Sequence, residues 1–396
     1  MSASPRADEQ PVGPTPPAVR RPLARLLVES VRGVTGPSDA AAEVDDVDVA
    51  VEAAAHHRVA PAVWRRLRSA GLPDSDLASA LGVLRHQQML RHMRTLIELR
   101  SLGEVLDDAG IPWVVAKGPV AAAHLWPSAD MREYHDVDVF VDRREFARAL
   151  TLLTAAGYTL ADRNWPVIVA DTRAELALTA PHGTPVDLHW HIAVPARLRR
   201  AFALDMSGAI ERRQIVAFGN GLTVPTFDPV DTVLHLAFHA AQAGGDRLMW
   251  AGDLHYALQR PGLDLDELVA RAQRAGITAP IALMLDRAVR TLATPIALPH
   301  DISRDGAGLW ARVVERAARS RPFPILPGDP HAGGNLYAGA RRGVAASVAA
   351  TVRLALAARS RERALDANGP EGRVLELDVP DEFARAGYFR EVQTGR

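Results

Sequence analysis

The sequence contains no cysteine, and this absence removes several kinds of chemistry at once. Disulfide bonds, thiolate-bound zinc and a thiol nucleophile are all excluded. A bound metal would have to be held by carboxylate oxygens or by imidazole nitrogens. Candidate metal sites are therefore clusters of Asp, Glu and His.

Lysine is nearly absent as well. Lys117 is the only lysine among 46 basic residues, and the other 45 are arginines. Under such a bias, positions that need only a positive charge drift to arginine. A retained lysine then indicates a place where a compact ammonium works and a planar guanidinium does not. The alternative is that this lysine has no special role and survived by chance.

The chain also lacks an appreciable net charge and any long apolar run. Its formal net charge is −1, so no overall field attracts it to nucleic acid or to an anionic membrane. The polar, Pro-rich start does not resemble a secretory leader, and no window approaches ~18 uncharged apolar residues. We therefore expect a cytoplasmic protein that has no membrane partner and for which nucleic acid is a disfavoured partner.

What is present is an ordinary globular composition, 48% hydrophobic and 23% charged, over 396 residues. This length is sufficient for two domains. Composition and apolar spacing predict five segments. These are a disordered Pro-rich tail at residues 1–22, a helical region at 23–110, an α/β core at 111–227, a second helical region at 228–366, and a loosely ordered tail at 367–396.

Short apolar or alternating runs mark the strands of the predicted core. They lie at residues 111–116, 136–141, 174–180, 185–194, 213–218 and 222–227. Helical spacing follows the first two of these runs, and the second helix ends at Gly157. The fold class predicted is α/β (α+β), a small mixed sheet flanked by N-terminal and C-terminal helical regions.

Two aspartates begin the strand at residues 136–141. Side chains alternate along a strand, so Asp136 and Asp138 should share one face while Val137, Val139 and Val141 enter the core. Neighbouring carboxylates repel unless a cation lies between them, and Mg²⁺ or Mn²⁺ prefers such oxygen ligands. The alternative is that these aspartates are ordinary turn or cap residues.

A second alternating strand places Asp187, His189 and His191 on one face. If it neighbours the strand at 136–141, Asp187 supplies a third carboxylate. Three carboxylates on adjacent strands can hold two metal ions that assist phosphoryl or nucleotidyl transfer. His189 would act as a base or orient the metal ligands, and a hydrogen-bonded structural role is the alternative.

Lys117 and Gly118 lie where the strand at 111–116 turns into a helix. Backbone N–H groups at such a start bind anions, glycine permits a phosphate to approach, and lysine adds a charge. A phosphate-binding turn is one interpretation. A plain strand-to-helix turn, with Pro119 in the first helical turn, is the other.

Taken in order, these motifs resemble those of the polymerase-β-like nucleotidyltransferase superfamily, and within it a family of stand-alone, uncharacterised bacterial nucleotidyltransferases. The matching positions are Lys117 and Gly118, Arg132, Asp136 and Asp138, Gly157 and Tyr158, and Asp187 with His189 and Trp190. A weaker likeness continues through Asp228, Pro229, Leu234, His235, His239 and the segment from Arg247 to Asp253. In one respect the chain departs from the wider superfamily, because Lys117-Gly118-Pro119 stands where a Gly-Ser pair is usual.

The resemblance implies a transfer of a nucleoside monophosphate from an NTP to a hydroxyl group, with release of pyrophosphate. Asp136, Asp138 and Asp187 would bind two Mg²⁺ (or Mn²⁺) ions, and Lys117, Gly118 and Arg132 would contact the nucleotide. ATP is the default NTP, and the acceptor is expected to be a small molecule, an antibiotic or natural-product intermediate, or a peptide. A nucleotide-binding pseudoenzyme that acts as a sensor and a helical scaffold protein are the alternatives.

Four further polar residues are expected near the acceptor: His189, His239, Arg247 and Asp253. His235 and His239 are four residues apart and share a helix face, but this spacing without a following acid is more typical of packing than of a metal site. Arg247 and Asp253 could line the acceptor cleft or form an ion pair on a helix.

Overall fold

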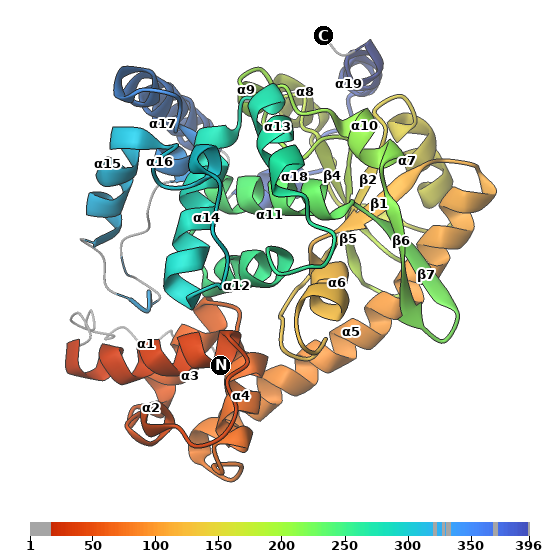
Figure 1. Cartoon of the computed structure of the whole chain (residues 1–396). Coiled ribbons are helices and arrows are strands. Elements are labelled where there is room, and N and C mark those ends of the chain that lie inside the picture. Colours follow the sequence, from red (N-terminus) through yellow and green to blue (C-terminus); the bar gives the residue numbers. More distant parts are fainter. Residues whose placement is uncertain (1–16, 320–322, 327–328, 330–333, 367–370, 395–396) are drawn as a thin grey trace, which may run out of the picture.

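Seven strands form one mixed sheet in the α/β core (Figure 1). The computed structural model describes residues 17–319, 323–326, 329, 334–366 and 371–394. The strands are β1 (Trp113–Ala116), β2 (Val137–Val141), β3 (Thr159–Leu160), β4 (Glu175–Thr179), β5 (Pro185–His189), β6 (Gln214–Gly219) and β7 (Leu222–Thr226). Their order is β3-β4-β5-β2-β1-β7-β6. β2 is parallel to β5 and β1 is parallel to β7, while the other neighbours are antiparallel. The predicted α/β (α+β) class is confirmed.

The two faces of β2 meet different surroundings, as the alternation of its side chains requires. Val137, Val139 and Val141 are fully buried in a core between the sheet and the helices that cover one face. Phe140 belongs to a smaller apolar cluster on the opposite face, with Phe227. Asp138 shares the face of Phe140 and therefore lies away from the larger core.

Helices cover the sheet and surround the predicted site. Within the core they are α6 (Gly118–Val120) with the π-helical turn η1 (Ala121–Leu125), α7 (Phe146–Ala155), α8 (Trp165–Ala170), α9 (Ala196–Arg199) and α10 (Met206–Glu211). The N-terminal helices are α1 (Pro17–Val31), α2 (Asp39–Ala42), α3 (Val47–His56), α4 (Ala60–Ser69) and α5 (Asp76–Asp108). Further along the chain come α11 (Pro229–Gln242), α12 (Leu248–Ala257), α13 (Leu265–Ala275), α14 (Thr278–Leu292), η2 (His300–Ile302), α15 (Gly308–Arg319), α16 (Gly334–Ala338) and α17 (Val344–Asp366).

The N-terminal and C-terminal helices share a single hydrophobic core. Leu26 and Leu27 of α1 are buried in the same cluster as Leu254 of α12 and Leu285 of α14. The red and cyan-green helices accordingly lie next to each other in Figure 1. Regions that the sequence suggests are separate flanks thus form one helical body beside the sheet.

The 33-residue helix α5 joins this body to the sheet. Its first turns contribute Leu81 to the helical core, and its last turns contribute Leu102 to the core under the sheet. Between them, the ring nitrogen Nδ1 of His92 lies 2.7 Å from the hydroxyl of Tyr134, and Arg91 donates to the Tyr134 carbonyl at 3.1 Å. The long helix therefore holds the loop that leads into β2.

The first helix begins earlier than composition suggests. Residues 1–22 are expected to be disordered, yet α1 starts at Pro17, and of this predicted tail residues 1–16 lie outside the described residues. Proline is well tolerated in the first turn of a helix because its missing N–H would have no partner there. The buried Leu23, Leu26 and Leu27 then anchor the helix by packing.

The expectation of a loosely ordered C-terminus at residues 367–396 is also wrong for the described part. Helices α18 (Glu371–Glu376) and α19 (Glu382–Thr394) form there, and α19 packs on α8. Tyr388 is fully buried, and its hydroxyl donates to the carbonyl of Arg173 at 2.7 Å. The low average hydrophobicity of the segment does not indicate a packed helix. A few buried aromatic contacts are nevertheless sufficient to dock it.

The strand that carries Asp187 is shorter than predicted. β5 ends at His189, whereas the sequence suggests a strand to residue 194. Beyond that point the Nδ1 atom of His191 accepts a hydrogen bond from the backbone of Ala193 at 2.9 Å, so His191 leaves the shared face. The two-residue strand β3 and the short helix α8 are not predicted, since neither is long enough to show a period.

Among the helices in the described parts of the chain, none combines the length and apolar composition that a membrane-spanning segment requires. The expected cytoplasmic location stays a prediction.

Replacement of Tyr388 by alanine tests the docking of α19. Because a large, fully buried aromatic side chain is removed, we expect Tyr388→Ala to lower the free energy of unfolding by about 3 to 5 kcal/mol in urea denaturation. Phe383 of the same helix is 82% exposed, so Phe383→Ala should change it by no more than about 0.5 kcal/mol. Equal, small effects of both variants would argue against the docked position of α19.

Candidate active site

The register of three neighbouring strands brings the predicted acidic residues together. β2 and β5 run parallel, with Asp138 opposite Asp187. On the other side of β2, Ala116 of β1 is opposite Asp138, so the next residue, Lys117, leaves β1 beside that carboxylate. The condition under which Asp187 supplies a third carboxylate, that its strand neighbours the strand with Asp138, is therefore met.

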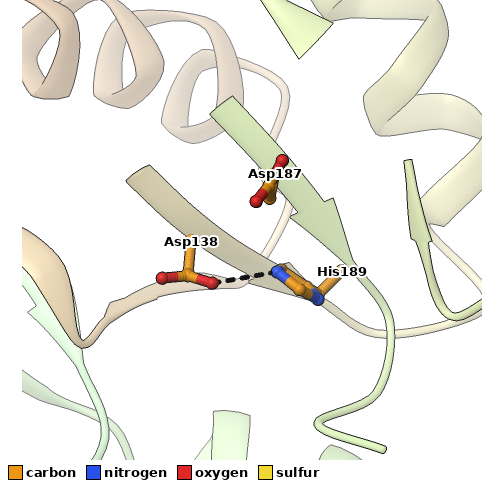
Figure 2. A group of neighbouring side chains, drawn as sticks. All are labelled: Asp138, Asp187 and His189. Carbon is orange, nitrogen blue, oxygen red and sulfur yellow. Dashed lines mark hydrogen bonds and ion pairs between the residues drawn. The ribbon is translucent and has the colours of Figure 1, made fainter. Parts of the chain in front are cut away.

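Asp138 is the centre of the polar contacts. Its Oδ1 atom lies 2.7 Å from the Nζ atom of Lys117 and 3.1 Å from the Nε2 atom of His189. Figure 2 shows Asp138, Asp187 and His189 grouped around a common space, with the contact to His189 dashed. One ligand atom from each of these three side chains lies within 4.8 Å of the other two, so this group could hold a metal ion.

Negative charge predominates at this point of the sheet. Burial, followed by the neighbouring charge of Asp138, raises the pKa of Asp136. Burial, followed by the carboxylates of Glu175, Asp138 and Asp136, raises the pKa of Asp187 well above its ordinary value. Asp136 and Asp187 are therefore destabilised as anions, as expected for carboxylates that are brought together to receive a cation.

Asp138 behaves in the opposite way because it has a partner. Burial alone would raise its pKa, but the Lys117 ammonium and the hydrogen bond from His189 hold that pKa far below its usual range. Burial likewise would lower the pKa of Lys117, and Asp138 raises it above the ordinary value instead. The two side chains therefore remain a charged pair.

Glu175 is a fourth carboxylate that sequence reasoning missed. It opens β4, where it is opposite His189 in the antiparallel pair β4–β5. Its Oε2 atom is 3.6 Å from the Nδ1 atom of His189, and its Oε1 atom accepts a hydrogen bond from Arg173 at 3.2 Å. The strand itself is predicted, but only the cross-strand register shows that its first residue reaches the site.

Lys117 occupies an unusual backbone conformation, with φ of 48° and ψ of −129°. Non-glycine residues seldom adopt positive φ, and such strain often occurs at functional positions. Gly118 follows because a Cβ atom there would lie 3.0 Å from the carbonyl oxygen of Asp136. The turn thus packs tightly against the strand entry and directs Lys117 at Asp138.

The helical segment that begins at Gly118 is not a regular α-helix. α6 has three residues and passes into the five-residue π-helical turn η1. So short a helix provides little macrodipole, because the dipole depends on many aligned peptides. A phosphate-binding role of Lys117 and Gly118 therefore rests on the lysine charge and on local N–H groups, and it stays a prediction.

A cavity of about 460 Å³ opens beside these residues. It is lined by Lys117, Gly118, Arg132, Asp136, Asp138, His239, Arg247 and Asp253, among the residues predicted for the site. Asp187 and His189 are not among its lining residues, and they contact the site through Asp138. Arg58 and Glu133, which the sequence prediction missed, also line the cavity, as does Trp250 of the segment from Arg247 to Asp253.

Arg58 reaches the cavity from the N-terminal helical region, far from every motif in the sequence. Like Lys117 it has a positive φ, 53°. Burial and then the nearby Arg247 lower its pKa, and Asp136 acts in the opposite direction. In the described part of the chain no acidic side chain lies within ion-pair distance of Arg58 or Arg247. Two half-buried guanidinium groups therefore face the cavity with unused donors.

Arg132 and Asp253 are bound to each other. Arg132 donates from Nε at 2.6 Å and from its second terminal nitrogen at 2.7 Å to the two oxygens of Asp253, and Trp126 donates to the same carboxylate at 2.8 Å. Arg132 also donates to the carbonyl of Gly118 at 3.3 Å. The sequence suggests either that Arg247 and Asp253 line the cleft or that they form an ion pair. Asp253 does form an ion pair, but with Arg132 and not with Arg247. Arg132 positions the Gly118 turn, while its predicted contact with a nucleotide is untested.

The two histidines of α11 lie outside the acidic group. His235 packs edge-on against Phe140, with ring centroids 5.2 Å apart, and His239 lines the cavity next to Trp250. Burial, followed by the Lys117 charge, lowers the pKa of both rings well below the ordinary value. Neutral, ring-packed histidines fit the packing and cavity-lining interpretation of the sequence.

Comparison with known families adds one finding. A family model described as "Uncharacterised nucleotidyltransferase" matches residues 43–293. The match runs from the end of α2 to the end of α14 and takes in every site residue discussed above. No curated protein matches the chain.

The Arg132–Asp253 pair provides a test of the packing around the cavity. Both side chains are buried, 3% and 1% exposed, so Asp253→Asn should leave an uncompensated guanidinium and lower the free energy of unfolding by about 3 to 5 kcal/mol. The exposed pair Arg25–Glu43 is the control, and Glu43→Gln should cost about 1 kcal/mol or less. Urea denaturation measures both changes. Similar decreases in the free energy of unfolding for Asp253→Asn and Glu43→Gln would contradict the buried ion pair.

Proposed function

Because the chain belongs to the family of uncharacterised nucleotidyltransferases, we propose that it transfers a nucleoside monophosphate from an NTP to an acceptor hydroxyl in a Mg²⁺-dependent reaction. Membership of the family makes the protein a transferase of phosphorus-containing groups and implies an NTP substrate. The metal, the identity of the NTP and the acceptor are the parts that we propose.

The observation that carries this proposal is the pairing of Asp138 with Asp187 on adjacent parallel strands, with Asp136 and Glu175 nearby. Glu175 is paired with Arg173, but three aspartates meet the single ammonium of Lys117, and a divalent cation would balance the excess. Asp138, Asp187 and His189, whose ligand atoms lie within 4.8 Å of one another, fit a cation, and we propose Asp136 as a further oxygen ligand. When bound, one or two Mg²⁺ (or Mn²⁺) ions would neutralise the triphosphate and polarise the reacting phosphate.

In the reaction, the oxygen of the acceptor hydroxyl forms a bond to the α-phosphorus of the NTP. The bond from that phosphorus to the bridging oxygen breaks, and pyrophosphate leaves with the electron pair. Asp187, which lies opposite Asp138 on the adjacent strand, accepts the hydroxyl proton. Lys117 and the Gly118 backbone hold phosphate oxygens, and His189 positions Asp138 through their 3.1 Å contact.

The nucleotide occupies the 460 Å³ cavity beside Asp136 and Asp138. The half-buried guanidinium of Arg58 is available for a phosphate, and Trp250 offers an aromatic face. ATP is the default choice of NTP. A small molecule, a natural-product intermediate or a peptide is the favoured acceptor, since a net charge of −1 provides no general attraction for nucleic acid.

A thermal-shift panel of the four NTPs, each with Mg²⁺, Mn²⁺ or a chelator, tests the substrate and the metal. A ligand at 100 times its Kd stabilises the folded protein by about 2.7 kcal/mol, so the preferred NTP should raise Tm only when the metal is present. The Asp187→Asn variant should abolish this increase. Its Tm without ligand should equal or exceed that of the wild type, because a destabilised carboxylate is removed.

Glu104→Gln is the matched control, because Glu104 is an exposed acidic residue on α5 far from the cavity. It should retain the full metal-dependent increase in Tm. An undiminished increase in the Asp187→Asn variant would reject the proposed metal site. No increase with any NTP in the wild-type protein would reject nucleotide binding itself.

Replacement of the single lysine tests whether a compact ammonium is needed. A guanidinium is longer and planar and would meet Asp138 in a different geometry from this strained turn, so we expect Lys117→Arg to lower transfer at least tenfold, about 1.4 kcal/mol of transition-state stabilisation. Release of pyrophosphate, with water as acceptor where no other is known, measures the rate. The exposed Arg94 provides the reverse exchange, and Arg94→Lys should be silent. Wild-type activity of Lys117→Arg would show that an arginine serves equally well at this position and that the lysine was retained by chance.

A further inference from the structure

A second cavity, of about 360 Å³, adjoins the first. The two share Asp246 and Arg247, which lie between α11 and α12 and line both. The second cavity is also lined by residues of α14 and α15 and by Tyr337 of α16. None of the site carboxylates Asp136, Asp138 and Asp187 lines it.

The walls of the second cavity combine apolar side chains with four arginines and with the acidic residues Asp246, Asp286 and Glu315. Its apolar lining residues are Leu248, Ala251, Leu283, Ala311, Val314 and Phe323. Two of its four arginines are neutralised locally: Arg290 lies 2.5 Å from Asp286 and 3.3 Å from Glu315, and Arg304 also pairs with Glu315. The other two arginines of the cavity are not neutralised in this way.

Arg287 and Arg247 are those two. Arg287 is half-buried and donates at 3.1 Å to the neutral hydroxyl of Tyr337. Arg247 is half-buried with its guanidinium 5.6 Å from the centre of the Trp250 ring. Within the described residues, neither has an acidic side chain within 4.0 Å. A half-buried guanidinium fork is best satisfied by the two oxygens of a carboxylate or a phosphate.

We propose that the second cavity binds the acceptor, and that this acceptor is an organic anion whose carboxylate or phosphate group is held by Arg287, with Arg247 in the wall that the two cavities share. The inference rests on the proposed function, since the reacting hydroxyl has to extend past Arg247 into the first cavity. The apolar wall contacts the carbon skeleton of the acceptor. A peptide with a free terminal carboxylate or an acidic metabolite has this chemistry, and a neutral alcohol lacks it.

Two simple probes test this site without knowledge of the natural acceptor. Phenyl phosphate and phenylacetate each carry an anion on an apolar ring, and benzyl alcohol is the neutral counterpart. Isothermal titration of the full chain, with and without a saturating metal–NTP complex, should detect at least one of the anions bound in both conditions. Benzyl alcohol should bind at least tenfold more weakly than that anion.

Variants then locate the binding. Arg287→Gln should weaken the binding of the anion at least tenfold, and Arg287→Lys, which keeps the charge but loses the fork, should weaken it less. Arg312 is an exposed arginine on α15 outside the cavity, so Arg312→Gln, which removes the same charge, should leave the affinity unchanged. If Arg287→Gln does not fold, Arg247→Gln takes its place.

The proposal is overturned if neither anion binds to the wild-type protein, if Arg287→Gln binds as tightly as the wild type, or if the metal–NTP complex displaces the probe. Failure of the proposed function is recognised separately. The Asp187→Asn variant, which should keep its stability, should lose metal–NTP binding while it retains the anionic probe. An anion that binds through Arg287 in a protein without any affinity for NTP would reject transfer and keep the anion site.

Discussion

The buried ion pair between Lys117 and Asp138 is the interaction on which the rest of the site depends. An isolated charge in this position would be strongly destabilising, so each side chain requires the other. Their 2.7 Å contact needs β1 and β2 in register, a strained turn at Lys117 and a glycine at position 118 that lets the turn approach Asp136. The parallel strand β5 then adds Asp187 next to Asp138, and the local charge becomes strongly negative.

The helical body decides what can reach this charge cluster. The Arg132–Asp253 pair fastens the loop before β2 to α12, while α5 holds the same loop at Tyr134. The first cavity therefore has walls from the N-terminal helices, the sheet and the C-terminal helices. This arrangement explains how a chain with a net charge of −1 concentrates opposite charges locally: carboxylates lie on the sheet, and the arginines of the helical body surround them.

Much of the core was predictable because its strands carry a clear two-residue period. Val137, Val139 and Val141 alternate with Asp136 and Asp138, and Asp187 alternates with Val186 and Leu188, so the faces follow from the sequence once a strand is recognised. Prediction failed where periodicity is weak or where packing overrides composition. β5 ends at His189 although the alternation continues, α1 starts within a Pro-rich segment, and Tyr388 docks a helix in a segment of low hydrophobicity.

The sequence by itself determined the chemical components of the site: the absence of thiols, a single lysine before a glycine, paired aspartates on a strand, and a third aspartate on a second strand. Only the tertiary structure decided which components meet. Glu175 joins the site through cross-strand register, Arg58 arrives from the N-terminal helices, Asp253 pairs with Arg132, and Arg287 faces a second cavity. The reason is physical, since local periodicity reports how a residue is oriented within its own element, whereas contacts between distant elements depend on how those elements pack.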